Sequence, residues 1–63
     1  MTYDIKILDK NGELIGEMIN TSSEDIRIFM QKGFTIINFH TGTEITEEIL
    51  MNNMGVSDGV IMN

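Results

Sequence analysis

The 63-residue sequence has no cysteine, no proline and no tryptophan, and only four of its residues are lysine or arginine. Without cysteine, disulfides and thiolate metal sites are excluded. The single histidine, His40, does not make a zinc site alone, so no metal or other cofactor is expected. The absence of cysteine also agrees with a reducing compartment, and we expect a cytoplasmic protein.

Long apolar runs are absent as well. None approaches the roughly 20 residues that span a bilayer, and no basic start followed by an apolar run marks a signal peptide, so no membrane association is expected. Ten carboxylates against four basic residues give a net charge of −6. This charge disfavours nucleic acid as a partner and favours either a basic protein or simple solubility.

The length allows one domain, residues 1–63. A chain of this size buries only about 60% of its unfolded surface, so its stability is marginal. With no disulfide or metal, the remaining sources of stability are packing and a partner subunit. We therefore expect a homodimer or a higher homo-oligomer.

The first part of the chain predicts a β-hairpin. Tyr3, Ile5 and Ile7 alternate with polar residues, and Asn11-Gly12 supplies the positive φ angles of a tight turn. Glu13 to Ile19 is the returning strand, in which Gly16 suggests either a bulge or a close approach of another backbone. Apolar residues lie on both faces of that strand, so we expect a partner to cover one face: Ile15 and Ile19 share a face with Glu17, and Leu14 and Met18 share the other.

A helix is predicted next, with a capping box at either Thr21/Glu24 or Ser22/Asp25. Its inward stripe is Ile26, Phe29 and Met30, with Arg27 and Gln31 facing away, and Gly33 ends it.

Residues 34–40 are rich in β-branched and aromatic side chains and predict a third strand, followed by a turn at Thr41-Gly42-Thr43. Thr43 or Thr46 then caps a second helix that ends at Gly55, with Glu44, Glu47 and Glu48 in its first turns and Ile45, Ile49 and Leu50 facing inward. The predicted fold class is α+β, in the order ββαβα. Val60, Ile61 and Met62 form either a short final strand or a contact with a neighbour.

Groups suited to catalysis are scarce. A Ser-His-acid set would combine His40 with Ser22, Ser23 or Ser57, and none of these serines lies in a strand–turn–helix elbow. The glutamates resemble charges that compensate a helix dipole. We expect no enzymatic activity, and we interpret His40 as a surface residue beside a turn or as a contact to a ligand or partner.

Methionine is abundant, at six residues, and it recurs on adaptable binding surfaces. Together with nearby aliphatic residues it defines a candidate surface, either for a homo-oligomer or for a different protein. The candidate interface residues are Leu14, Met18, Ile49, Met51, Met54, Val60 and Met62.

Residues 21–54 carry Ser23-Glu24-Asp25-Ile26-Arg27, Lys32-Gly33-Phe34, Thr41-Gly42-Thr43-Glu44-Ile45-Thr46 and Ile49-Leu50. In these motifs the chain resembles the N-terminal domain of the polyhydroxyalkanoate synthesis repressors. The resemblance implies a small domain of a transcriptional regulator that binds DNA and polymer granules. That family carries a basic and aromatic segment before its first helix, whereas this chain has Lys10-Asn11-Gly12-Glu13-Leu14-Ile15. The resemblance therefore extends to the fold more readily than to DNA binding.

The sequence thus favours a small acidic regulatory or protein-interaction module, such as a phage-type inhibitor or an adaptor. A DNA-binding regulator is the alternative, and it requires Lys6, Lys10, Arg27 and Lys32 on one face. A small enzyme would require a deep pocket lined by His40 and carboxylates.

Overall fold

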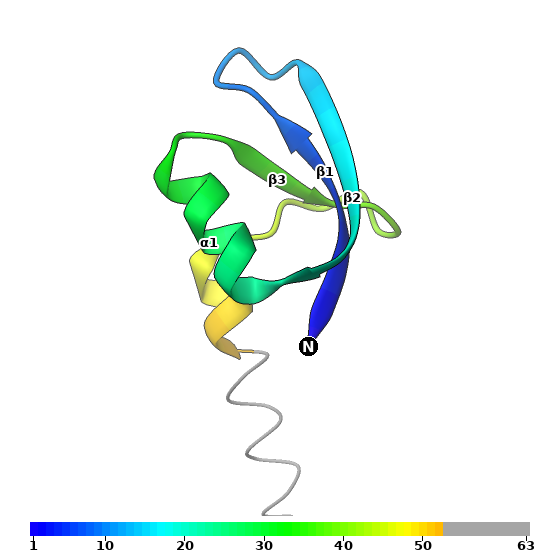
Figure 1. The fold of residues 1–63 in the computed structure, drawn as a ribbon, viewed down its shortest axis with the longest axis vertical. Helices are drawn as coiled ribbons and strands as arrows, with labels where there is room; N and C mark the ends of the chain where they lie inside the picture. Colours follow the sequence, from blue (N-terminus) through cyan, green and yellow to red (C-terminus); the bar gives the residue numbers. More distant parts are fainter. Residues whose placement is uncertain (53–63) are drawn as a thin grey trace, which may run out of the picture.

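The computed structural model describes residues 1–52, which form a three-stranded antiparallel sheet and two helices. The elements are β1 (Thr2–Leu8), β2 (Leu14–Ser22), α1 (Ser23–Gln31), β3 (Thr35–Asn38) and a second helix that is described over residues 47–52. Both helices lie on one side of the sheet (Figure 1). The ββαβα order of the predicted α+β fold is confirmed, whereas the Gly55 stop and the final strand at residues 60–62 lie outside the described residues.

The hairpin between β1 and β2 is wider than the tight turn expected from Asn11-Gly12. The Gly12 amide donates to the Asp9 carbonyl at 2.9 Å, and the Asp9 amide donates to the Glu13 carbonyl at 2.8 Å. Of the two turn residues only Gly12 has a positive φ, 86°. This is the three-residue loop in which a turn is followed by a left-handed glycine. The Asp9 carboxylate selects it by accepting the amides of Asn11 and Glu13.

The sheet order is β2-β1-β3, and β2 carries two irregularities against β1. Tyr3 pairs with Thr21 and Ile5 with Met18, so Ile19 and Asn20 together oppose Asp4. At the other end Ile15 is the extra residue, between partners of Ile7 and Leu8. The bulged residue is therefore Ile15, next to Gly16, where the sequence suggested a bulge. The second bulge contains Asn20 at a φ of 53°, a left-handed conformation that asparagine tolerates better than most residues.

Helix α1 begins at the second of the two predicted caps. The Ser22 hydroxyl accepts the amide of Asp25 at 3.1 Å, whereas Thr21 belongs to β2 and its hydroxyl caps nothing. At the other end the Gly33 amide donates to the Met30 carbonyl and the Phe34 amide to the Phe29 carbonyl, which is the Schellman pattern. The predicted stop at Gly33 is confirmed, with a φ of 95°.

The segment after β3 folds back along the outer edge of that strand. Strand β3 ends at Asn38, earlier than predicted, because the Asn38 side chain accepts the amides of His40 and Thr41 and turns the chain. Residues 43–45 then return beside β3, with a bridge between Ile37 and Glu44. Glu44 is therefore not in the first turn of the second helix, as the sequence suggested.

The second helix is capped by the later of the two predicted threonines. The Thr46 hydroxyl accepts the amide of Ile49 at 3.3 Å, and helical residues begin at 47. Leu50 and Ile45 face inward, as expected. Ile49 was also expected to face inward, but it is 36% exposed.

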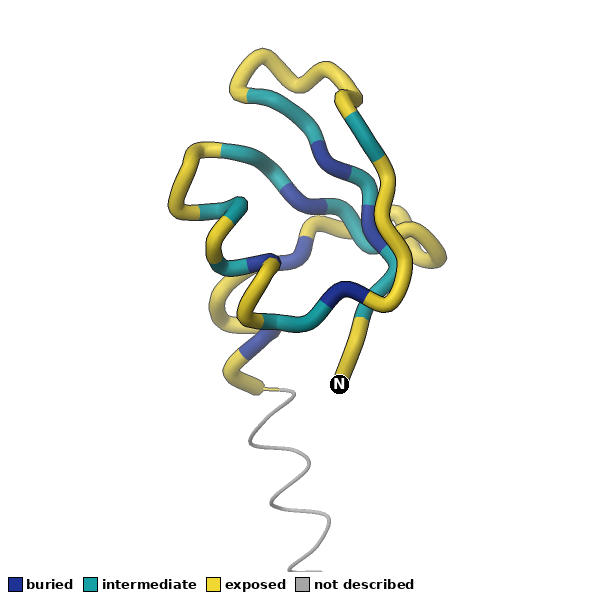
Figure 2. The backbone as a smooth tube through the Cα atoms, viewed as in Figure 1, coloured by how far each residue is buried: buried dark blue, intermediate teal, exposed yellow. Residues whose placement is uncertain are grey.

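The core lies between the sheet and the two helices, where Figure 2 shows the buried positions of each element facing one another. It is small and almost entirely aliphatic, and four partly buried residues close its margin: Tyr3, Phe29, Met30 and Phe34. The buried apolar residues are Ile5, Ile7, Ile26, Ile36, Ile45 and Leu50. Across residues 1–52, no helix is both long enough and apolar enough to cross a membrane.

Candidate interaction surface

Strand β2 presents the open edge of the sheet. Strand β1 is central, and the outer edge of β3 is covered by the returning residues 43–45. There the Asn38 amide donates to the Thr43 carbonyl and the Ile45 amide to the Ile36 carbonyl, each at 2.8 Å. Nothing in residues 1–52 covers β2 in the same way, so its outward backbone groups are available for pairing.

The hydrogen-bond pattern identifies which backbone groups of β2 face outward. Because the Phe39 amide donates to the Asp4 carbonyl, the even-numbered residues of β1 direct their backbone groups at β3 and the odd-numbered ones at β2. Met18 and Gly16, the partners of Ile5 and Ile7, therefore point their backbone groups inward. Glu17 lies between them and points its amide and carbonyl away from the sheet.

Exposed aliphatic side chains are concentrated on the same strand. Nine large apolar side chains are exposed in the part of the chain that the structure describes, and four of them lie on β2. Ile19 is the most exposed of the four, at 73%. We call the following residues the β2 surface: Leu14, Ile15, Glu17, Met18 and Ile19.

The predicted interface residues fall into three groups. Leu14 and Met18 belong to the β2 surface, and Ile49 and Met51 are exposed on the second helix, away from that strand. The remaining three, Met54, Val60 and Met62, lie outside the described residues. Ile15 and Ile19 are not among the predicted interface residues, although both are exposed in the structure. The presence of apolar residues on both faces of this strand was the sequence signal that could have identified them.

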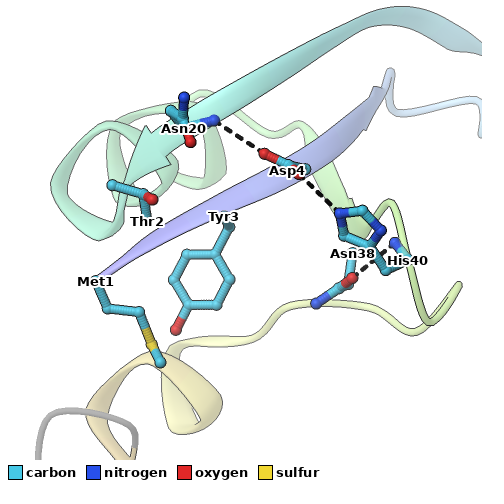
Figure 3. A pocket seen from close by; sticks show the side chains of 7 residues that line it. All are labelled: Met1, Thr2, Tyr3, Asp4, Asn20, Asn38 and His40. Carbon is cyan, nitrogen blue, oxygen red and sulfur yellow. Dashed lines mark hydrogen bonds and ion pairs between the residues drawn. The ribbon is translucent and has the colours of Figure 1, made fainter.

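A polar pocket of about 470 Å³ lies at one end of the sheet (Figure 3). Asp4, in β1, is at its centre, and its carboxylate joins β2 to the turn that follows β3. One carboxylate oxygen accepts the Asn20 amide at 3.0 Å, and the other lies 2.7 Å from His40 Nε2. The remaining lining residues are Met1, Thr2, Tyr3 and Asn38.

The two hydrogen bonds on Asp4 have an electrostatic consequence. The bond from the His40 side chain, and then the bond from the Asn20 backbone, stabilise the carboxylate and hold the pKa of Asp4 below its ordinary value. The carboxylate thereby fixes the bulge of β2 and the turn after β3. This explains why His40 lies beside β1, a contact between residues 36 positions apart.

The pocket combines His40 with a single carboxylate, Asp4, whereas the enzyme alternative requires a deep pocket lined by His40 and several carboxylates. Its lining includes no serine or cysteine nucleophile, and the His40 side chain is 68% exposed, so water competes for its hydrogen bonds. Both partners of the Asp4–His40 pair already serve the fold. In residues 1–52 no cluster of three or more histidine, aspartate or glutamate side chains is arranged for a metal ion.

The four basic residues do not share one face. Lys6 Nζ lies 5.2 Å from the centre of the Phe39 ring, and Arg27 pairs with Glu47 at 2.7 Å. Lys10 and Lys32 do approach each other, at a hollow of about 200 Å³ beside Phe34. A continuous basic surface for phosphates is therefore not formed by these residues.

Comparison of the chain with protein-family models, curated proteins and solved structures found no match. The resemblance to the polyhydroxyalkanoate synthesis repressors stays a prediction, and the functional argument depends on the geometry of the site.

Proposed function

We propose that this chain is a non-enzymatic protein-interaction module that binds a partner protein at the β2 surface. The observation that supports the proposal is the coincidence, on one strand, of an open hydrogen-bonding edge and four exposed aliphatic side chains. Edge strands are normally blunted by lysine, proline, β-bulges or a covering segment, and β2 has a bulge on each side of its straight run. Strand β2 has no lysine or proline, and the part of the chain that the structure describes places no segment over it.

The energetics agree with binding. Moving one isoleucine side chain from water into a dry interface contributes roughly 1.5 to 3 kcal/mol. Two or three such side chains contribute about 3 to 9 kcal/mol before the cost of association, so the expected complex is weak and transient. A regulatory or adaptor role follows from this activity, because the module supplies contact and no chemistry.

Self-association is a separate proposal, and it involves the other exposed apolar residues. Ile49 and Met51 project from the second helix, and a second copy of the chain would bury them. Light scattering over a range of protein concentrations tests it. A mass that stays at one chain up to high micromolar concentration would contradict it.

The test of the β2 proposal compares two matched substitutions. Ile19→Lys places a charge on the β2 surface, and Ile28→Lys places the same charge on α1, where the isoleucine is 48% exposed. Each protein is used as bait in an extract of the native host, and the captured proteins are identified by mass spectrometry. We expect partners that the wild type and Ile28→Lys capture and that Ile19→Lys loses. Identical captures by all three baits would refute the proposal.

A further inference from the structure

Glu17 is the one charged residue in the straight part of the open edge. Gly16, Glu17 and Met18 pair regularly with β1, and a bulge lies on each side of them. The backbone amide and carbonyl of Glu17 point outward from this run, so a strand added to β2 forms its hydrogen bonds at Glu17. The residue of the added strand that lies opposite would have its side chain beside the Glu17 carboxylate.

The Glu17 carboxylate forms no ion pair with any of residues 1–52. Its partner across the sheet is Lys6, but the Lys6 ammonium lies over the Phe39 ring, and no ion pair joins the two side chains. A carboxylate in the middle of an otherwise aliphatic edge is costly to cover unless the incoming strand carries a positive charge. The net charge of −6 acts in the same direction over a longer range.

A second copy of the chain is a poor occupant of this edge. In a symmetric antiparallel pair centred on the straight run, Glu17 of one copy would lie opposite Glu17 of the other. Like charges directly opposite each other destabilise paired strands. The bulges also bend β2 at both ends of the run, which a short flexible segment follows more easily than an identical folded strand does.

We propose that the occupant is an extended segment of a different protein, added as a fourth strand along β2, with lysine or arginine opposite Glu17 and aliphatic residues on either side. The inference rests on the proposed function and gives the chemistry of its partner. Backbone hydrogen bonds at Glu17 supply the docking geometry, and Ile15 and Ile19 supply apolar contact on either side. The central cation distinguishes this partner from other extended chains.

The experiment uses the whole chain and two synthetic peptides. One has the sequence Thr-Val-Thr-Lys-Thr-Val-Thr, and the other carries glutamate in place of the lysine. Binding is measured by fluorescence anisotropy at low salt, and the amide resonances of isotopically labelled protein locate it. We expect the lysine peptide to bind about three- to tenfold more tightly, to shift the β2 amides and to slow hydrogen exchange at Glu17. Methylation of alternate backbone nitrogens in the peptide abolishes binding if a strand is added.

Charge reversal makes the test specific. In Glu17→Lys the preference should invert, so that the glutamate peptide binds more tightly. Glu24→Lys, at an exposed position in α1, changes the net charge equally and should leave the preference for the lysine peptide in place. A circular dichroism spectrum of each variant first confirms that it folds.

Four results would overturn the inference. Equal binding of the two peptides, or an equal effect of Glu24→Lys, would remove the role of Glu17. Protection of the Glu17 amide that depends only on protein concentration would make a second copy the occupant. Failure of both peptides to shift the β2 amides would refute strand addition. The proposed function fails separately, if Ile19→Lys loses none of the captured partners.

Discussion

The buried hydroxyl of Thr21 gives the sharpest prediction from the fold. Thr21 is 2% exposed, and its Oγ1 has no hydrogen-bond partner among the described residues. A buried polar group without a partner costs roughly 1 to 3 kcal/mol. Valine has nearly the same shape, lacks the hydroxyl and is at least as favourable in a strand. We therefore expect Thr21→Val to stabilise the protein, whereas most substitutions destabilise.

The expected gain in stability is large compared with the total unfolding free energy of a chain of this size. At about 0.05 to 0.15 kcal/mol per residue, 63 residues have an unfolding free energy of roughly 3 to 9 kcal/mol. Removing the hydroxyl should add about 1 to 2 kcal/mol. The melting temperature should then rise by roughly 4 to 8 °C for each kcal/mol.

Urea denaturation followed by far-ultraviolet circular dichroism measures the change. The matched variant is Ser22→Ala, which removes the observed cap of α1 and should cost about 1 kcal/mol. The two neighbouring substitutions should therefore change the free energy of unfolding in opposite directions. If Thr21→Val is less stable than the wild type, the Thr21 hydroxyl has a partner, and the assignment of the cap to Ser22 alone is wrong.

Four further substitutions test the core, the end of α1 and the Asp4 contact, each by denaturation. Leu50→Ala should lower the free energy of unfolding by about 2 to 5 kcal/mol, because Leu50 is 1% exposed. Its matched control, Ile49→Ala, should change that free energy by less than about 1 kcal/mol, because Ile49 is 36% exposed. Equal losses in the two variants would contradict the orientation of the second helix. Gly33→Ala should cost about 1 to 2 kcal/mol through its left-handed backbone alone, because an added Cβ meets nothing within 4 Å. For Asp4 the lowered pKa means that its contribution is present above the ordinary aspartate pKa, about 3.9, and is lost as the pH falls through the folded pKa. The stability difference between wild type and Asp4→Asn should therefore be constant above about pH 5 and shrink as the pH falls below about 4, and a difference that stays constant there would mean that the carboxylate charge has no role.

The exposed apolar residues of the proposed interaction surface were partly predictable from the sequence. Leu14 and Met18 were selected because the returning strand carries apolar residues on both of its faces, more than one face of a sheet buries. Ile15 and Ile19 were read as one face of a regular strand. Their exposure follows from the position of β2 at the edge of the sheet, and that position depends on the pairing with β1, which no local pattern encodes.

The sequence by itself determined the local elements, because their signals act over a few residues. The Ser22 cap, the Gly33 stop and the Thr46 cap each involve contacts within about five positions. The tertiary structure decided between the alternative caps: Thr21 is buried, so that Ser22 caps α1, and the segment that contains Thr43 lies beside β3, so that Thr46 caps the second helix. It also brought His40 to Asp4 and left β2 as the open edge, because the chain after β3 folds back on that strand. Those outcomes depend on which distant segments pack together, and no short stretch of sequence contains that information.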